Sequence, residues 1–279
     1  MNKIPLLLAI AVMPLAASAQ TVYINETFDT DTIGIAPTDA AQKYSSQTLV
    51  QAGSGVMGTD RLAQINDATG SAGGIEYNVG TSALGTLYTS FDLFNNAPSG
   101  TGNGTQPLIF GIGAWNSSAS LVMNANATRY FGLEFFALGT TQTFKLRVGG
   151  SAVYTSVYNP SEVQHVQVWI NDHNSNALSY TRPDNFQTAS LSANSVVVYI
   201  NNVLYGASAT GYAIQQLGDM SDATMGRVSF ISGSSTVSNF SIDNLYVAAP
   251  IPEPSTYAAI AGFAALGLCV WQRRRTRQA

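Results

Sequence analysis

The sequence has little charge, and this already excludes several classes of protein. Only 10% of its 279 residues are charged, whereas an average soluble domain carries about 25%. The net charge is −4, which argues against a nucleic-acid-binding protein, because such proteins carry a basic surface. Hydrophobic residues make up 46%, which argues against a disordered chain. Gly, Asn, Ser and Thr replace the missing charge, and this composition is typical of an all-β protein with many short loops.

Cysteine is almost absent as well. The single cysteine is Cys269, within an apolar run near the C-terminus. The rest of the chain therefore has no disulfide, no cysteine nucleophile and no cysteine-ligated metal. A domain of about 230 residues needs no disulfide, because it already buries most of its surface. Cys269 fills space in an apolar helix or carries a lipid, and we expect the former.

The few basic residues are concentrated at the two ends of the chain, namely Lys3, Arg273, Arg274, Arg275 and Arg277. Without these five and Glu253, 7 basic and 15 acidic residues remain, so the middle of the chain carries about −8. A basic partner or a divalent cation fits this middle part better than DNA does. The ends require separate interpretations.

The N-terminus has the pattern of a secretory signal peptide. Lys3 is followed by an apolar stretch from Ile4 to Leu15 and then by Ala17-Ser18-Ala19. This order predicts cleavage by signal peptidase between Ala19 and Gln20. An uncleaved anchor or a buried strand is the alternative. We therefore expect residues 1–19 to be removed and the protein to be exported.

The C-terminus combines a proline-rich motif, an apolar run and a basic end. The motif occupies positions 252–256 and consists of Pro252, Glu253, Pro254, Ser255 and Thr256. The apolar run covers about 257–271, which is short for a membrane span of about 20 residues. The positive-inside rule predicts that Arg273, Arg274, Arg275 and Arg277, within the basic end 273–277, stay in the cytoplasm.

Residues 251–279 resemble the PEP-CTERM sorting domain of Gram-negative bacteria, which has the same three parts in the same order. The resemblance implies that an exosortase in the inner membrane recognises the tail. The precursor would be anchored there transiently, and the ectodomain would then reach the cell surface or the extracellular matrix. Proteins of this kind often accompany exopolysaccharide and biofilm formation. A plain C-terminal transmembrane helix is the alternative, and it predicts the same orientation.

The residue pattern in the middle of the chain, residues 20–249, predicts one all-β domain. Val166, Val168 and Ile170 alternate with His165, Gln167 and Trp169, which is the period of a strand with one buried face. Ile200-Asn201-Asn202-Val203 indicates a tight hairpin, and only Tyr212–Leu217 has a helical pattern. The predicted strands are Val22–Phe28, Leu62–Ile65, Gly74–Val79, Leu87–Phe94, Pro107–Ala114, Tyr130–Ala137, Thr143–Val148, Val163–Asn171, Ala177–Thr181, Ser195–Ile200, Val228–Ile231 and Phe240–Val247. The predicted architecture is a two-sheet antiparallel sandwich, followed by the tail at 250–279.

Short motifs at both ends of this domain resemble concanavalin-A-like jelly-roll proteins. They are Asn25-Glu26-Thr27-Phe28-Asp29 near the start and Ser241-Ile242-Asp243-Asn244-Leu245-Tyr246-Val247 near the end. The hairpin at 196–205 is similar to one in laminin-G-like members. The resemblance implies a jelly-roll sandwich in which the first and last strands lie side by side.

Motifs for catalysis are missing. Glucanases of this fold carry Glu-x-Asp-x-x-Glu or Glu-x-Asp-x-Glu, which places two carboxylates about 5–5.5 Å apart, and neither pattern occurs. A Gly-x-Ser-x-Gly nucleophile elbow is absent too. We therefore expect a protein that is not an enzyme. The alternative is a polysaccharide hydrolase or lyase that pairs acids from different strands.

Candidate ligand-binding residues are aromatic or lie on the polar face of a predicted strand. Trp169 shares a face with His165 and is the best candidate for an exposed aromatic that stacks on sugars. Trp115 lies at the end of a strand, where binding loops occur. His165 is a hydrogen-bonding residue of a sheet in the simpler interpretation. His173 lies in a polar turn.

A structural calcium ion is the one cofactor that the sequence suggests, although none is required. Glu26, Asp29 and Asp243 come close together if the first and last strands pair, with Asp31 nearby. Carboxylate oxygens are the ligands that Ca²⁺ prefers. In the alternative, Asp29 and Asp31 cap a turn and Asp243 faces solvent. Overall, the sequence predicts an exported, surface-sorted protein that binds or structures extracellular polysaccharide, with a purely structural matrix protein as a further alternative.

Overall fold

The structure is a computed structural model, and it describes residues 20–43, 46–53, 55–58, 60–67, 73–80, 85–96, 108–114, 129–138, 141–148, 151–159, 161–173, 175–205, 209–213, 225–232 and 239–250. The predicted signal peptide, the sorting motif with its apolar run and basic end, and Trp115 lie outside these residues. Within the described part of the chain, no helix has the length and apolar character needed to cross a membrane.

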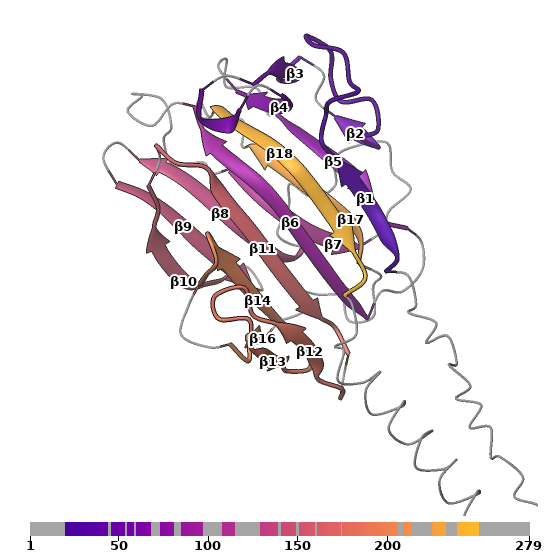
Figure 1. Ribbon diagram of the computed structural model, residues 1–279, viewed down its shortest axis with the longest axis vertical. Helices are drawn as coiled ribbons and strands as arrows, with labels where there is room; N and C mark the ends of the chain where they lie inside the picture. The colour runs from indigo at the N-terminus through magenta and orange to yellow at the C-terminus, as the bar shows by residue number, and fades with distance from the viewer. Residues whose placement is uncertain are drawn as a thin grey trace, which may run out of the picture. The chain divides into compact units, whose positions relative to one another are not determined.

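Two antiparallel sheets form the framework (Figure 1). Sheet A follows the order β15 (Val203–Leu204), β14 (Ser195–Ile200), β11 (Gln164–Asn171), β6 (Thr86–Asn95), β18 (Asn239–Ala248), β4 (Arg61–Asn66) and β3 (Thr48–Ala52), with β1 (Val22–Glu26) beside β18 and β16 (Tyr212–Ala213) beside β14. Sheet B follows the order β10 (Ser151–Val157), β9 (Thr141–Val148), β8 (Arg129–Leu138), β7 (Leu108–Ala114), β17 (Met225–Ser232), β5 (Gly74–Asn78) and β2 (Gln42–Lys43). A separate hairpin joins β12 (Leu178–Thr181) to β13 (Thr188–Leu191), and η1 (Gly55–Met57) is a single 3₁₀ turn.

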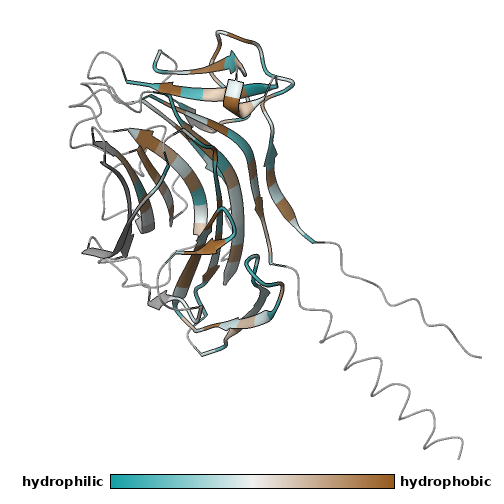
Figure 2. Cartoon of the chain, turned by 60° about the vertical axis from the view of Figure 1, so that its left-hand side comes forward, coloured by the Kyte–Doolittle hydropathy of each residue, from teal (hydrophilic) through white to brown (hydrophobic). Residues whose placement is uncertain are grey.

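The core lies between the two sheets and is centred on phenylalanines. Phe91 of sheet A packs against Phe110 and Phe230 of sheet B, with ring centroids 4.6 and 4.8 Å apart. All three side chains are fully buried. Figure 2 shows apolar and polar segments alternating along several of the strands. This alternation lets each sheet bury one face and leave the other for solvent or ligands.

Strand β11 shows how the sequence determines this arrangement. Val166, Val168 and Ile170 are fully buried in the core, as their period-two spacing predicts. His165 lies on the opposite face and is partly exposed. Pairing with β6 and β14 on either side fixes the register of β11, and a shift by one residue would turn the apolar set outward.

The first and last strands pair, which confirms the jelly-roll closure predicted from the sequence. Glu26 of β1 lies opposite Leu245 of β18, and Val22 lies opposite Ala248. The hairpin at Asn201-Asn202 is confirmed too. Both asparagines have positive φ angles, 52° and 61°, which is the conformation of a type I′ turn.

Two kinds of sequence prediction need correction. The helix expected at Tyr212–Leu217 is wrong where the structure describes it, because Tyr212–Ala213 form β16 and pair with β14. The prediction also lacked the strands β2, β3, β10, β13 and β16. Most of these lie at sheet edges or are very short, so their period-two pattern is weak.

Candidate functional site

The outer face of sheet A brings polar side chains from three neighbouring strands into one row. His165 of β11 lies opposite Asp92 of β6, and Asp92 lies opposite Asp243 of β18. The inner faces of the same strands are occupied by core residues such as Phe91 and Val166. The pleat that buries the apolar residues therefore directs this polar row outward.

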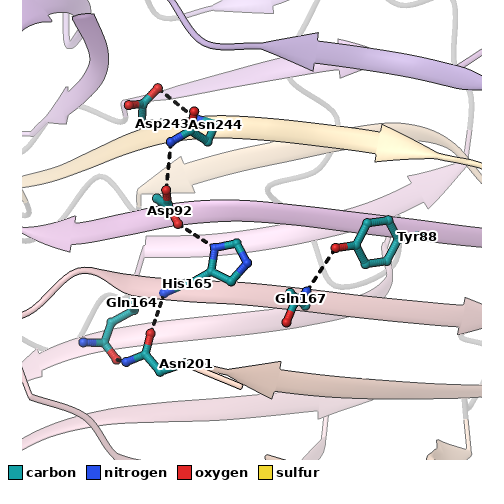
Figure 3. A network of polar contacts seen from close by, with 8 residues as sticks. All are labelled: Tyr88, Asp92, Gln164, His165, Gln167, Asn201, Asp243 and Asn244. Carbon is teal, nitrogen blue, oxygen red and sulfur yellow. Dashed lines mark hydrogen bonds and ion pairs between the residues drawn. The ribbon is translucent and has the colours of Figure 1, made fainter. Parts of the chain in front are cut away.

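Hydrogen bonds connect the row across the strands, as Figure 3 shows. His165 Nδ1 lies 2.7 Å from Asp92 Oδ1, and Asn244 Nδ2 donates to Asp92 Oδ2 at 2.8 Å. On the other side, the backbone N–H of His165 donates to Asn201 Oδ1 at 2.7 Å. We call Asn201, His165, Asp92, Asn244 and Asp243 the polar strip. The His165 side chain is 43% exposed and that of Asp92 22%. Asn201 and Asn244 are exposed as well, whereas Asp243 is buried.

A β-bulge in β18 positions Asn244. The pairing of β18 with β6 shifts between Asp243 and Tyr246, so one extra residue is inserted there. Asn244 has a φ of 53°, a conformation that asparagine tolerates better than most residues. Its side chain reaches Asp92, while its backbone N–H donates to Asp243 Oδ1 at 2.7 Å. Asn244 thus lies between the two carboxylates (Figure 3).

The two carboxylates of the strip have pKa values that move in opposite directions. Burial raises the pKa of Asp243 to about 7, and the nearby charges of Asp92, Asp29 and Asp60 add to the effect. Burial also acts to raise the pKa of Asp92, but the hydrogen bonds from His165 and Asn244 outweigh it and lower that pKa. At neutral pH, Asp92 is therefore ionised while Asp243 is partly protonated.

Two half-buried tyrosines border the polar strip. Tyr88 of β6 and Tyr246 of β18 have ring centroids 6.2 Å apart, and we call them the tyrosine pair. Gln167 Nε2 donates to the Tyr88 hydroxyl at 3.2 Å. Tyr88 lies four residues before Asp92 on the same face of β6, which corresponds to roughly 13 Å. The strip and the tyrosine pair together offer hydrogen-bonding groups beside aromatic surface.

Trp169 is not the exposed aromatic that the sequence suggested. Only 8% of it is exposed, because the β12–β13 hairpin folds over this end of sheet A. Its ring lies 5.1 Å from that of Tyr180 in β12 and 5.7 Å from that of Tyr199 in β14. These residues form a second, smaller core with Leu191 and Val197. A large aromatic on the outer face of a strand was buried by a hairpin that the sequence pattern did not reveal.

The residues of the predicted calcium site lie at the junction of β1 and β18, but they do not converge. Each carboxylate uses one oxygen to accept from a backbone N–H: Glu26 from Phe28, Asp29 from Arg61, and Asp243 from Asn244. The described residues contain no group of three or more His, Cys, Asp or Glu side chains placed to hold a metal ion.

Two buried glutamates lie on sheet B, and they are too far apart to act as a hydrolytic pair. Glu76 of β5 forms an ion pair with Arg227 of β17, and both are buried. Glu134 lies on β8, so β17 and β7 separate it from Glu76. Three strand spacings amount to roughly 14 Å, which exceeds the carboxylate separation of glycosidases.

Asp92, Asn244, Tyr88 and Tyr246 were not predicted as site residues. Asp92 and Tyr88 occupy polar positions of the alternating run that was predicted as a strand, so their outward direction could have been inferred. Their partners could not, because Asp92 is 73 residues from His165 and 152 from Asn244. Only the strand order brings these residues together.

The fold is shared with known structures, although the sequence is not similar to any characterised relative. No family model matches the chain, and no curated protein matches it. The structure is similar to that of the carbohydrate esterase vb_24B_21 from the Shiga toxin-encoding bacteriophage phi24B, with a TM-score of 0.52 and 9% identity over 83% of this chain and 99% of that chain.

Weaker structural similarity extends to two lectin-type domains. The carbohydrate recognition domain of Emp47p has a TM-score of 0.48 and 11% identity over 83% of this chain and 98% of that chain. The lectin I of Ulex europaeus, solved with the methyl glycoside of α-L-fucose, has a TM-score of 0.41 and 14% identity over 78% of this chain and 96% of that chain. Identities as low as these leave the activity of this chain open.

Proposed function

We propose that this protein binds extracellular polysaccharide, without cleaving it, through the polar strip and the tyrosine pair. The main observation behind this proposal is the polar strip on the outer face of sheet A. His165, Asn201 and Asn244 are accessible from solvent, hydrogen bonds hold the side chains of the row in place, and two half-buried tyrosines lie nearby. Sugars present hydroxyl groups at their edges and apolar patches on their faces, and this surface offers a partner for each.

Preorganisation favours binding at this row. Asp92 accepts hydrogen bonds from His165 and Asn244, so its carboxylate is already oriented before a ligand arrives. A charged acceptor forms stronger hydrogen bonds with hydroxyl groups than a neutral one does. The fold supports the proposal at the level of architecture, because a protein of similar structure is a carbohydrate esterase.

We further propose that the protein is exported and sorted to the cell surface. This part rests on the sequence alone: the signal-peptide pattern before Gln20 and the motif at 252–256 with its apolar run and arginines. Signal peptidase and an exosortase would be the processing partners, and the inner membrane would hold the precursor transiently. A structural calcium ion at Glu26, Asp29 and Asp243 stays a prediction, which melting with calcium and with chelator tests.

The binding proposal is tested with residues 20–249 on an array of neutral, acidic and amino polysaccharides. We expect selective binding to at least one class. The double variant His165→Ala, Asp92→Asn should weaken it by about tenfold or more, because it removes hydrogen bonds to a charged group. His173→Ala is the matched control, since His173 lies in an exposed turn against Gly85. Absence of binding to every polysaccharide would favour a purely structural matrix protein.

A polysaccharide hydrolase or lyase is the second candidate, and one observation favours it. Asp92 and Asp243 lie opposite one another on neighbouring strands with pKa values shifted in opposite directions, which is a pattern of acid–base pairs. Incubation of the polysaccharide that binds, followed by measurement of reducing ends and unsaturated products, separates this candidate from binding alone. Product release that Asp243→Asn abolishes would establish the enzyme.

A further inference from the structure

A pocket lies at the edge of the sandwich, beside β1, the strand that pairs with β18. It has a volume of about 260 Å³ and lies between β1 of sheet A and β5 of sheet B. Its lining consists of Tyr23, Ile24, Asn25, Glu26, Asp39, Ala41, Tyr77 and Asn78. Apart from Ile24 and Ala41, every one of these side chains carries a polar group, and the two charged ones are both acidic.

Negative charge is concentrated around this pocket. Burial raises the pKa of Glu26, and the charges of Asp31, Asp39 and Asp29 raise it further, while the backbone N–H of Phe28 opposes them. Two basic side chains, Lys43 and Arg61, are directed to backbone carbonyls. Lys43 Nζ donates to the carbonyl of Pro37 at 2.6 Å, and Arg61 Nη1 donates to the carbonyl of Asp31. A cation in the pocket would relieve the repulsion that Glu26 experiences.

A buried hydroxyl without a partner points to a ligand. Tyr77 is 3% exposed and lines the pocket, and its hydroxyl has no hydrogen-bond partner among the described residues. Burial raises the pKa of this hydroxyl, and the charges of Glu26, Asp31 and Asp39 raise it further. Glu26 and Asp39 line the same pocket. A buried polar group without a partner costs free energy, and such groups are rare in native proteins.

We propose that this pocket binds a primary ammonium group, with Glu26 and Asp39 as the anionic partners and the Tyr77 hydroxyl as an uncharged acceptor. An ammonium group has three donors and no acceptor, which matches two carboxylates and one hydroxyl. The size of the pocket leaves room for an organic body on the ammonium group, beside the rings of Tyr23 and Tyr77. Calcium fits less well, because it requires six to eight oxygen ligands and the described acids are not gathered into a metal-binding group.

Two kinds of ligand carry a primary ammonium group: an amino sugar of a polysaccharide and a free polyamine. Calorimetric titration of residues 20–249 with glucosamine, N-acetylglucosamine, putrescine and calcium distinguishes them. We expect glucosamine or putrescine to bind and N-acetylglucosamine, whose nitrogen is neutral, to bind at least about tenfold more weakly. Tighter binding of glucosamine assigns the site to amino sugars and tighter binding of putrescine assigns it to polyamines, and both support the proposal.

Substitutions locate the binding. Glu26→Gln with Asp39→Asn should weaken amine binding by about tenfold or more, and Tyr77→Phe should weaken it less. Glu162→Gln is the matched control, because Glu162 is an exposed acid on another loop. Melting curves verify that each variant folds, and Tyr77→Phe keeps a test available if the double variant does not.

Three results would overturn the proposal: no binding of either amine, equal binding of N-acetylglucosamine, or amine binding that the folded pocket variants retain in full. The lining of the pocket shares no residue with the polar strip. The variant His165→Ala, Asp92→Asn should therefore bind amines normally, so a failure here is distinguishable from a failure of the proposed polysaccharide function.

Discussion

At the scale of single residues, Asn244 connects the backbone of β18 to the chemistry of the polar strip. Its positive φ permits the bulge, and its side chain orients Asp92. One residue thus adjusts both the local geometry of the strand and the electrostatics of its neighbour. A substitution at this position separates the two roles, because glycine accepts the φ angle and lacks the side chain.

Asn244→Ala should lower the free energy of unfolding by about 2 kcal/mol, and Asn244→Gly by about 1 kcal/mol. Both variants lose the hydrogen bond to Asp92. Alanine keeps a Cβ at a positive φ that it tolerates less well than asparagine does, whereas glycine has no Cβ and accepts this φ. Urea denaturation of residues 20–249 measures both values. Equal losses in the two variants would contradict the role assigned to the backbone.

The raised pKa of Asp243 gives a prediction with a definite sign. Between pH 3.8 and about 7, the unfolded chain releases this proton while the folded protein retains it, so the folded state loses stability as the pH rises. Asp243→Asn keeps the acceptor for the N–H of Asn244 and removes the charge. We expect the variant to gain about 1 kcal/mol at pH 8, which is roughly 2–4 °C in Tm, and to gain nothing at pH 3.

Thermal melts of the two proteins at pH 3 and pH 8 provide the measurement. Asp92 should affect stability in the opposite direction to Asp243, because its pKa is lowered rather than raised. Asp92 contributes stability above its unfolded pKa and loses that contribution as the pH falls through the folded value. A gain for Asp243→Asn that is the same at both pH values would show that the charge of Asp243 is not responsible.

At the scale of elements, the β12–β13 hairpin decides which part of sheet A is open to ligands. It covers Trp169 and Tyr199 and leaves His165, Asn201 and Asn244 accessible. The Tyr180 hydroxyl lies 3.1 Å from that of Tyr199 and donates to the carbonyl of Ala209 at 2.9 Å. The hairpin is therefore held by both aromatic packing and hydrogen bonds.

Tyr180→Ala should lower the free energy of unfolding by about 3 kcal/mol, because it removes a large buried side chain from the second core. Tyr180→Phe keeps the packing and loses only the hydroxyl contacts, so we expect a loss of about 1 kcal/mol. Guanidinium denaturation measures the difference. If Tyr180→Ala were as stable as Tyr180→Phe, the ring would not be holding the hairpin on the sheet.

Long strands with many apolar residues could be predicted from the sequence, and short strands with few apolar residues could not. Strands β6, β11 and β18 have long alternating runs, so their position and inner faces could be predicted. The short strand β13 contains Thr188, Ala189, Ser190 and Leu191 and has no such pattern. The contacts of the site depend on strand order, which the motifs at 25–29 and 241–247 indicated for β1 and β18 but not for β6 and β11.

At the scale of the whole molecule, the proposals of export and of sorting by the C-terminal tail can each be tested. Mass spectrometry of the mature protein should show an N-terminus at Gln20. An intact Met1 in the envelope fraction would contradict export with cleavage.

Replacement of Pro252, Glu253 and Pro254 by alanine should retain the protein in the inner membrane, because the apolar run and the arginines remain. Unchanged surface delivery of this variant would contradict recognition of the motif.

The central claim is that polysaccharide binds at the polar strip, and the two histidines permit a direct test. His165 and His173 are the only imidazoles in the chain, so their ¹H–¹³C NMR signals are assigned with one His173→Gln variant. Residues 20–249 are titrated with oligosaccharides of the polysaccharide class that binds on the array. The account predicts that the His165 signal shifts in a saturable manner while the His173 signal stays in place. An unchanged His165 signal at saturation would contradict it.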